Sequence, residues 1–102
     1  MELIAELADY IEDEIRDAKK YARHAIRSRD IRSELAVLFH QLALEELGHM
    51  GRLHDAVKEV IERYRSEHGD PPEAMQKRYE KAHEKMMDET AEVYGILGRF
   101  TA

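Results

Sequence analysis

Apolar residues recur every three or four positions along almost the whole chain, with charged residues between them. This spacing follows the 3.6-residue turn of an α-helix, so the pattern predicts an all-α protein. Only two short stretches interrupt it, SRD at residues 28–30 and HGDPP at residues 68–72. We therefore predict three helices, at about residues 2–27, 31–67 and 72–97, in a single domain that spans residues 1–102.

The interruptions also predict how the helices begin and end. Ser28 or Asp30 would cap the start of the second helix. Gly69 would end that helix, and Asp70 would cap the third, with proline in its first turn. Gly95 and Gly98 are expected to weaken the third helix at its end.

Two carboxylates and a histidine occupy the apolar stripes of the first two helices. At about 100° per residue, Glu14 falls within about 60° of a group of apolar residues on the first helix, namely Leu3, Leu7, Ile11, Ala18, Tyr21 and Ala25. Glu46 lies at the centre of the second stripe, and His49 lies about 60° round from it. That stripe consists of Leu35, Phe39, Leu42, Met50, Leu53, Val57, Val60 and Tyr64.

The heights of these residues agree as well. If the first two helices form a long antiparallel hairpin folded at Asp30, Glu14 and Glu46 lie equally far from the fold, and at 1.5 Å per residue they stand at one level. His49 lies one turn further along. The sequence therefore predicts that Glu14, Glu46 and His49 converge in the interior.

This combination is typical of metal sites, because buried carboxylates are tolerated when they bind a cation. A Glu on one helix with Glu-x-x-His on its neighbour is half of a di-iron carboxylate site. A two-fold dimer of the hairpin would supply the other half and complete a four-helix bundle. The alternative is a metal-free, hydrogen-bonded polar cluster inside a three-helix bundle, which rarely gains stability.

A second Glu-x-x-His pair, Glu80 and His83, is placed differently. The stripe of the third helix is Met75, Tyr79, Met86, Val93 and Leu97, so His83 falls at its edge and Glu80 faces away. We expect Glu80 to be solvated and His83 to be an edge residue or a group behind the metal ligands. Among the other residues, Met50, Met75, Met86 and Met87 are expected to fill the core, and His24, His40, His54 and His68 to lie on the surface.

Gly48 and Gly51 fall on the other side of the second helix, near Val37 and Leu44. Small residues there would let another helix approach closely, either the third helix or a neighbouring subunit.

Composition excludes several classes of function. The chain has 102 residues, a net charge of −6 and no cysteine. Its acidity argues against binding to nucleic acid or anionic membranes, and the lack of cysteine excludes disulfides and Cys-based zinc sites. The acidic, patterned N-terminus does not look like a signal peptide, and no apolar run approaches membrane-spanning length, so we expect a cytoplasmic protein.

The segments EDEIRDAKKYARHA and LALEELGHMGRLH resemble the ferritin-like superfamily, which includes the rubrerythrins. One Glu and one Glu-x-x-His in a chain of this length is closest to the encapsulated-ferritin-like branch. The resemblance implies iron binding by Glu14, Glu46 and His49, with Glu46 bridging, and a tyrosine near the site, Tyr21. It also implies homodimers that share each di-iron site and can associate into rings.

The implied function is a ferroxidase that oxidises Fe(II) with dioxygen or peroxide. The alternatives are a peroxide-reducing oxidoreductase of rubrerythrin type, against which the missing Cys-rich domain argues, and a metal-free helical assembly protein. Two features depart from the family. Its acidic entry patch is present only as Asp13 and Asp17, with Arg16 between them, and YGILGRFTA follows the third helix without the linker that precedes an encapsulin cargo tag. The second departure argues against encapsulation.

Overall fold

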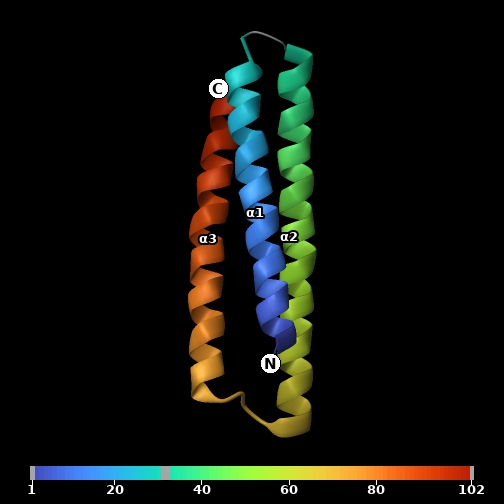
Figure 1. The fold of residues 1–102 in the computed structure, drawn as a ribbon, viewed down its shortest axis with the longest axis vertical. Helices are drawn as coiled ribbons and strands as arrows, with labels where there is room; N and C mark the ends of the chain where they lie inside the picture. The colour runs from blue at the N-terminus through green and yellow to red at the C-terminus, as the bar shows by residue number, and fades with distance from the viewer. Residues whose placement is uncertain (1, 31–32, 102) are drawn as a thin grey trace.

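The structure, a computed structural model, describes residues 2–30 and 33–101, and every secondary-structure element in them is a helix (Figure 1). The helices are α1 (Glu2–Ser28), α2 (Ser33–His68) and α3 (Glu73–Thr101). The prediction of an all-α protein with three helices is therefore confirmed. The expected start of the second helix, at residues 31–32, lies outside the described residues. None of the three helices is long and apolar enough to cross a membrane.

The first helix lies between the other two (Figure 1). It packs along α2 as an antiparallel hairpin, as predicted, and α3 runs back along its other side, whereas α2 and α3 touch each other only sparsely. The molecule is a rod of 55 × 18 × 17 Å with a radius of gyration of 16.4 Å. A compact domain of this length would have a radius of about 13 Å. The chain thus exposes an unusually large share of its helix surfaces.

The core follows the side of α1 that faces both neighbours. Small residues on α1, among them Ala18 and Ala22, let the helices approach closely, and Ile15 and Val93 are the largest fully buried side chains. The buried cluster is Ile4, Ile11, Ile15, Ala18, Ala22, Ala43, Leu47, Met50, Val57, Met86, Val93, Ile96 and Leu97. The expectation that Met87 fills the core was wrong, because its side chain is exposed.

The junction between α2 and α3 corrects one predicted cap. Gly69 ends α2 as expected, with a left-handed φ of 80° and its N–H donated to the Arg65 carbonyl at 3.0 Å. The N–H groups of Met75 and Gln76, however, both donate to the carbonyl of Pro72 at 3.0 Å. Pro72 is therefore the cap residue of α3, not Asp70. The cause is the Pro-Pro pair, since the residue before each proline is forced out of the helical conformation.

The expected weakening of the third helix at Gly95 and Gly98 does not occur, because α3 continues to Thr101. Ile96 and Leu97 are buried between these glycines. Tertiary packing therefore outweighs the cost of about 1 kcal/mol for each glycine in a helix interior.

Candidate metal site

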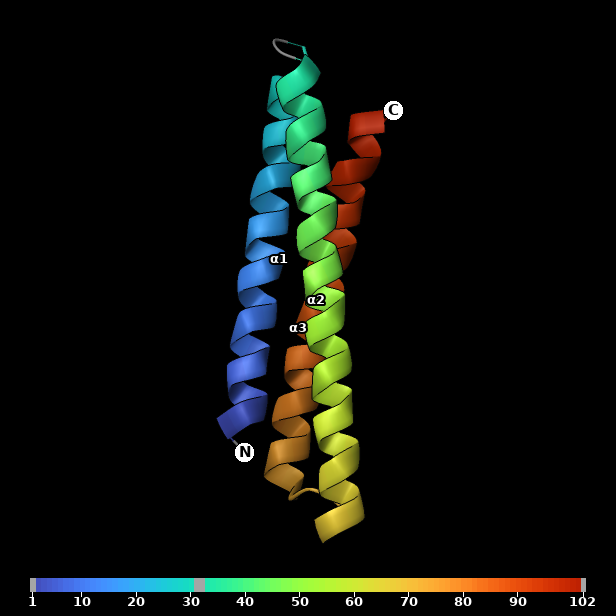
Figure 2. The same cartoon turned by 90° about the vertical axis from the view of Figure 1, so that its right-hand side faces the viewer.

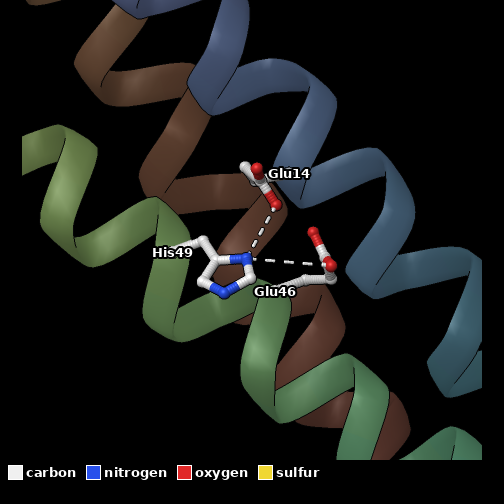
Figure 3. Close-up of side chains that lie close together, drawn as sticks. All are labelled: Glu14, Glu46 and His49. Carbon is white, nitrogen blue, oxygen red and sulfur yellow. Dashed lines mark ion pairs between the residues drawn. The ribbon is translucent and has the colours of Figure 1, made fainter.

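Glu14 of α1 meets Glu46 and His49 of α2 at one level of the hairpin (Figure 3). His49 Nδ1 lies 3.5 Å from Glu14 Oε2 and 3.8 Å from Glu46 Oε1. Each residue offers one ligand atom, and these atoms all lie within 4.8 Å of one another. Among the described residues, no other group of three or more His, Cys, Asp or Glu side chains meets this condition. The structure thus brings together the three residues that the helical pattern predicted to converge.

The site does not lie in the interior of the single chain, which corrects the prediction. The exposed fractions of the side chains are 26% for Glu14, 18% for Glu46 and 51% for His49. In Figure 3, α3 passes behind the hairpin, and the three side chains lie in front of it. The three residues therefore line a face of the hairpin that α3 leaves uncovered.

Ion pairs link α3 to the other side of α1. Lys85 of α3 contacts Glu12 at 2.9 Å. Glu92 of α3 contacts Lys19 at 2.9 Å. At about 100° per residue, Glu12 and Lys19 lie roughly 140–160° round α1 from Glu14. The charged partners of α3 thus lie on the side of α1 away from Glu14.

We call the uncovered side the open face and define it by two rows of residues with seven-residue spacing, Leu3–Tyr10–Asp17 on α1 and Leu35–Leu42–His49 on α2. Leu3, Tyr10 and Leu35 are exposed although they are large and apolar. The open face thus leaves apolar side chains exposed beside Glu14, Glu46 and His49.

The electrostatics of the site raise the pKa of Glu46. The pKa of Glu46 is raised from 4.5 to about 7, first by a hydrogen bond with Glu14, then by burial and by the charge of Glu14. His49 lowers this pKa and Asp17 raises it further, both to a smaller extent. Glu14 Oε2 is shielded from solvent and accepts no hydrogen bond of good geometry. Glu46 therefore holds a proton in part of the molecules near neutral pH, and a cation beside it would favour the charged carboxylate instead.

Two carboxylates and one imidazole form a donor set suited to iron, manganese or zinc. Ligand atoms about 2.0–2.2 Å from one ion lie roughly 3–4 Å apart, which is close to the spacing found here. Three ligands leave further coordination positions open to water, to a substrate or to groups from a second chain. The residues therefore fit half of a two-metal carboxylate site.

Tyr21 is not part of this group. Its ring stacks on the ring of Phe39 with the centroids 6.1 Å apart. The ring of His24 also packs on Phe39, with the centroids 4.7 Å apart. Seven residues of helix place Tyr21 roughly 10 Å along α1 from Glu14. The structure thus gives Tyr21 a packing partner and no contact with the three ligands.

In the second Glu-x-x-His pair, Glu80 is exposed, as expected, and His83 is half-buried. The ring of His83 stacks on Tyr79 at 5.9 Å and packs against His54 at 5.1 Å. The expectation that His54 lies on the surface was wrong, because its Nε2 is shielded from solvent and has no hydrogen-bond partner.

A seven-residue row on α2 could have revealed this placement. His40, Leu47, His54 and Ile61 recur at that spacing, and seven residues are about two turns of helix. The row faces α3, since the ring of His40 stacks on Phe100 at 4.5 Å and His54 meets His83. His24 is also half-buried, against Phe39, so only His68 of the four histidines is exposed as expected.

Gly48 and Gly51 lie in open space. A Cβ added at either position would meet no atom within 4 Å, so α3 is not the helix for which these small residues make room.

The chain was compared with models of known protein families, with curated proteins and with solved structures, and none of them matches it.

Proposed function

We propose that the chain binds iron through Glu14, Glu46 and His49, and that two copies join their open faces to form a two-metal site that oxidises Fe(II). The observation that carries this proposal is the meeting of the three side chains on the open face. They surround Glu14 Oε2, an oxygen that is shielded from solvent and has no hydrogen-bond partner. The resemblance of the two hairpin segments to ferritin-like proteins supports the choice of iron.

A purely structural cluster is a poor account of these residues. A hydrogen bond with Glu14, burial and the charge of Glu14 raise the pKa of Glu46 to about 7, so without a cation the charged form of Glu46 is disfavoured at this site. His49 is half-exposed and interacts with both carboxylates at distances beyond a good hydrogen bond. An apolar pair at these positions would be more stable, so the arrangement favours a metal site over a metal-free assembly protein.

A second copy supplies what one chain lacks. Two chains related by a two-fold axis would bring four carboxylates and two imidazoles together, the set that a di-iron carboxylate site uses. They would also cover Leu3, Tyr10 and Leu35 on each partner. The side of a rod of 55 × 18 Å offers on the order of 1,000 Å², enough for the roughly 800 Å² per partner of a stable interface.

Fe(II) is the substrate of the proposed reaction. Two Fe(II) ions give one electron each to dioxygen, which takes up two protons and leaves as hydrogen peroxide. With peroxide as the oxidant, two Fe(II) and two protons yield two Fe(III) and two waters. Glu14 and Glu46 would bind the ions as carboxylates, so the proton that Glu46 holds near neutral pH would leave on binding.

The absence of cysteine favours Fe(II) oxidation over sustained peroxide reduction. A peroxide reductase must return Fe(III) to Fe(II) in each cycle and needs an electron donor. The chain carries no cysteine with which to hold an iron–sulfur centre of its own, so this alternative requires a separate donor protein.

Anaerobic titration with Fe(II), followed by light scattering and calorimetry, tests the binding and the assembly together. We expect one ion per chain and a shift from monomer to dimer as the metal binds, because binding to the dimer alone stabilises it by mass action. A monomer that binds two ions per chain would contradict the shared site, and the absence of stoichiometric binding would favour the metal-free protein.

Two tyrosines provide a matched control for the dimer face. The side chains of Tyr10 on the open face and Tyr94 on α3 are 53% and 57% exposed. Tyr10→Lys should weaken metal-linked dimerisation by about tenfold or more, whereas Tyr94→Lys should leave it unchanged. The oxidation itself is followed as dioxygen consumed per Fe(II), with and without peroxide; about two Fe(II) per dioxygen are expected.

A further inference from the structure

Two histidines, His54 of α2 and His83 of α3, form one of the ring contacts between these two helices. The rings of His54 and His83 lie 5.1 Å apart with an angle of 32° between their planes. His54 Nε2 is shielded from solvent and has no hydrogen-bond partner. A shielded polar atom without a hydrogen-bond partner lowers stability unless it finds a partner in the functional state.

A cavity of about 530 Å³ lies beside this pair, between the three helices. His54 and His83 line it together with Tyr79 and the thioether side chains of Met75 and Met86. Met86 follows His83 by three residues, so both lie on the same face of α3. The rim of the cavity carries the carboxylates of Asp9, Glu12 and Glu89 beside the cations Arg78 and Lys85.

We propose that His54, His83 and the sulfur of Met86 bind a soft transition-metal cation, Cu(I), at a second site that clips α3 onto the hairpin. The proposal is independent of the iron site, with which it shares no residue.

The ring geometry is compatible with one ion between the two imidazoles. A ring that binds through a nitrogen about 2 Å from the ion has its centroid roughly 3 Å from it. Two such rings around one ion lie roughly 4.5–6 Å apart, and the observed 5.1 Å falls within that range.

The donor set separates this site from the first one. Glu80 and Glu84, on either side of His83, are exposed, and among the described residues no carboxylate joins His54 and His83 to make a group of three. Neutral imidazoles with a thioether prefer a soft ion such as Cu(I), whereas Fe(II) prefers carboxylates.

Burial supports the neutral form that metal binding requires. It lowers the pKa of His54 below 6.5, and the neighbouring His83 lowers it further. Asp55 raises this pKa and Lys58 lowers it, both by smaller amounts. A lowered pKa favours the neutral imidazole, which is the form that binds a metal ion.

Anaerobic competition against a chromogenic Cu(I) chelator tests the site. Wild type should hold one Cu(I) per chain, and His54→Gln or His83→Gln should each weaken binding by at least about tenfold. Met86→Leu keeps the volume of the side chain but removes the sulfur, and it should weaken binding to a similar extent. The matched control is His40→Gln, which changes a histidine in the same row of α2 that packs on Phe100 instead of a second histidine.

Two results would overturn the proposal. One is a wild-type affinity no greater than that of the His54→Gln/His83→Gln double variant, and the other is an equal loss in His40→Gln. If His54→Gln fails to fold by circular dichroism, His83→Gln and Met86→Leu decide the outcome. Glu46→Ala should retain Cu(I), so the failure of the iron site and the failure of this site can be told apart.

Discussion

The two Glu-x-x-His pairs have the same spacing and lie on long helices, yet their surroundings are opposite. In Glu46-Leu47-Gly48-His49, Leu47 is buried, and Glu46 and His49 lie beside Glu14 of α1. In Glu80-Lys81-Ala82-His83, Lys81 is exposed and Glu80 faces solvent. The i, i+3 spacing puts two side chains on one side of a helix, but the neighbouring residues decide what that side faces.

The partner across the helix interface differs as well. Glu46 and His49 meet the carboxylate of Glu14, whereas His83 meets the imidazole of His54. One pair therefore belongs to a carboxylate-rich group on the open face, and the other contributes one histidine to a pair of imidazoles at the cavity. In Figure 2, α2 lies in front of α3, and α1 lies beside them. The first group is formed between α1 and α2, and the histidine contact is formed between α2 and α3. The same four-residue motif thus lies in two different surroundings.

The strongest test removes one residue from each pair. Glu46→Ala or His49→Ala should lower Fe(II) affinity by more than about 100-fold, because either change leaves only two ligands in each chain. Glu80→Ala should keep the affinity within about twofold of wild type, since Glu80 is exposed and far round its helix from the core. Anaerobic calorimetry with Fe(II) measures all three variants.

If Glu80→Ala lowers the Fe(II) affinity as much as Glu46→Ala does, α3 contributes to the iron site and the two pairs are equivalent. Circular dichroism of each variant provides the control for folding.

The raised pKa of Glu46 predicts how the metal-free protein responds to pH. The pKa of Glu46 is about 7 in the folded chain against an ordinary value of 4.5, so the folded state binds the proton more tightly. The free energy of unfolding should therefore rise as the pH falls from 8 through 7 toward about 5. Since water screens part of the interaction between Glu46 and Glu14, we expect the free energy of unfolding to rise by about 1–2 kcal/mol.

Glu46→Gln isolates this contribution. The amide can donate to Glu14 at every pH, so the variant should be more stable than wild type at pH 8 by about 1–2 kcal/mol and should lose the gain on acidification. Chemical denaturation between pH 5 and pH 8 in the presence of a chelator measures both effects, with Glu80→Gln as the matched control. A variant less stable than wild type at pH 8 would show that the Glu46 carboxylate is a stabilising structural group.

Helix periodicity was enough to predict the hairpin and the level at which Glu14 and Glu46 meet. Both follow from the rise and the turn angle of a straight helix, which vary little. The solvated position of Glu80 was predictable for the same reason, because it lies outside the apolar stripe of its helix.

The positions that depend on the packing of α3 were not predictable in this way. The sequence pattern does not show that ion pairs at Glu12 and Lys19 hold α3 on the far side of α1, so the three ligands were expected in the interior. The burial of His54 depends on the same choice, since α3 provides its partner. The cap of α3 depends on two successive prolines, whose local steric effect overrides the capping preference of Asp70.

The smallest effect concerns the third residue of each pair, Gly48 in one and Ala82 in the other. Both positions are exposed and lie inside helices, and a Cβ added at Gly48 meets no atom within 4 Å. Gly48→Ala should therefore raise the free energy of unfolding of the metal-free chain by about 0.5–1 kcal/mol, and Ala82→Gly should lower it by a similar amount. Gly48 lies roughly 160° round α2 from Glu46, away from the open face, so the metal-linked dimer should form as in wild type. Thermal melting gives the stability, and light scattering with Fe(II) gives the assembly. If Gly48→Ala stabilises the metal-free chain but weakens the dimer, a second subunit packs on the glycine side of α2, and the dimer does not join through the open face alone.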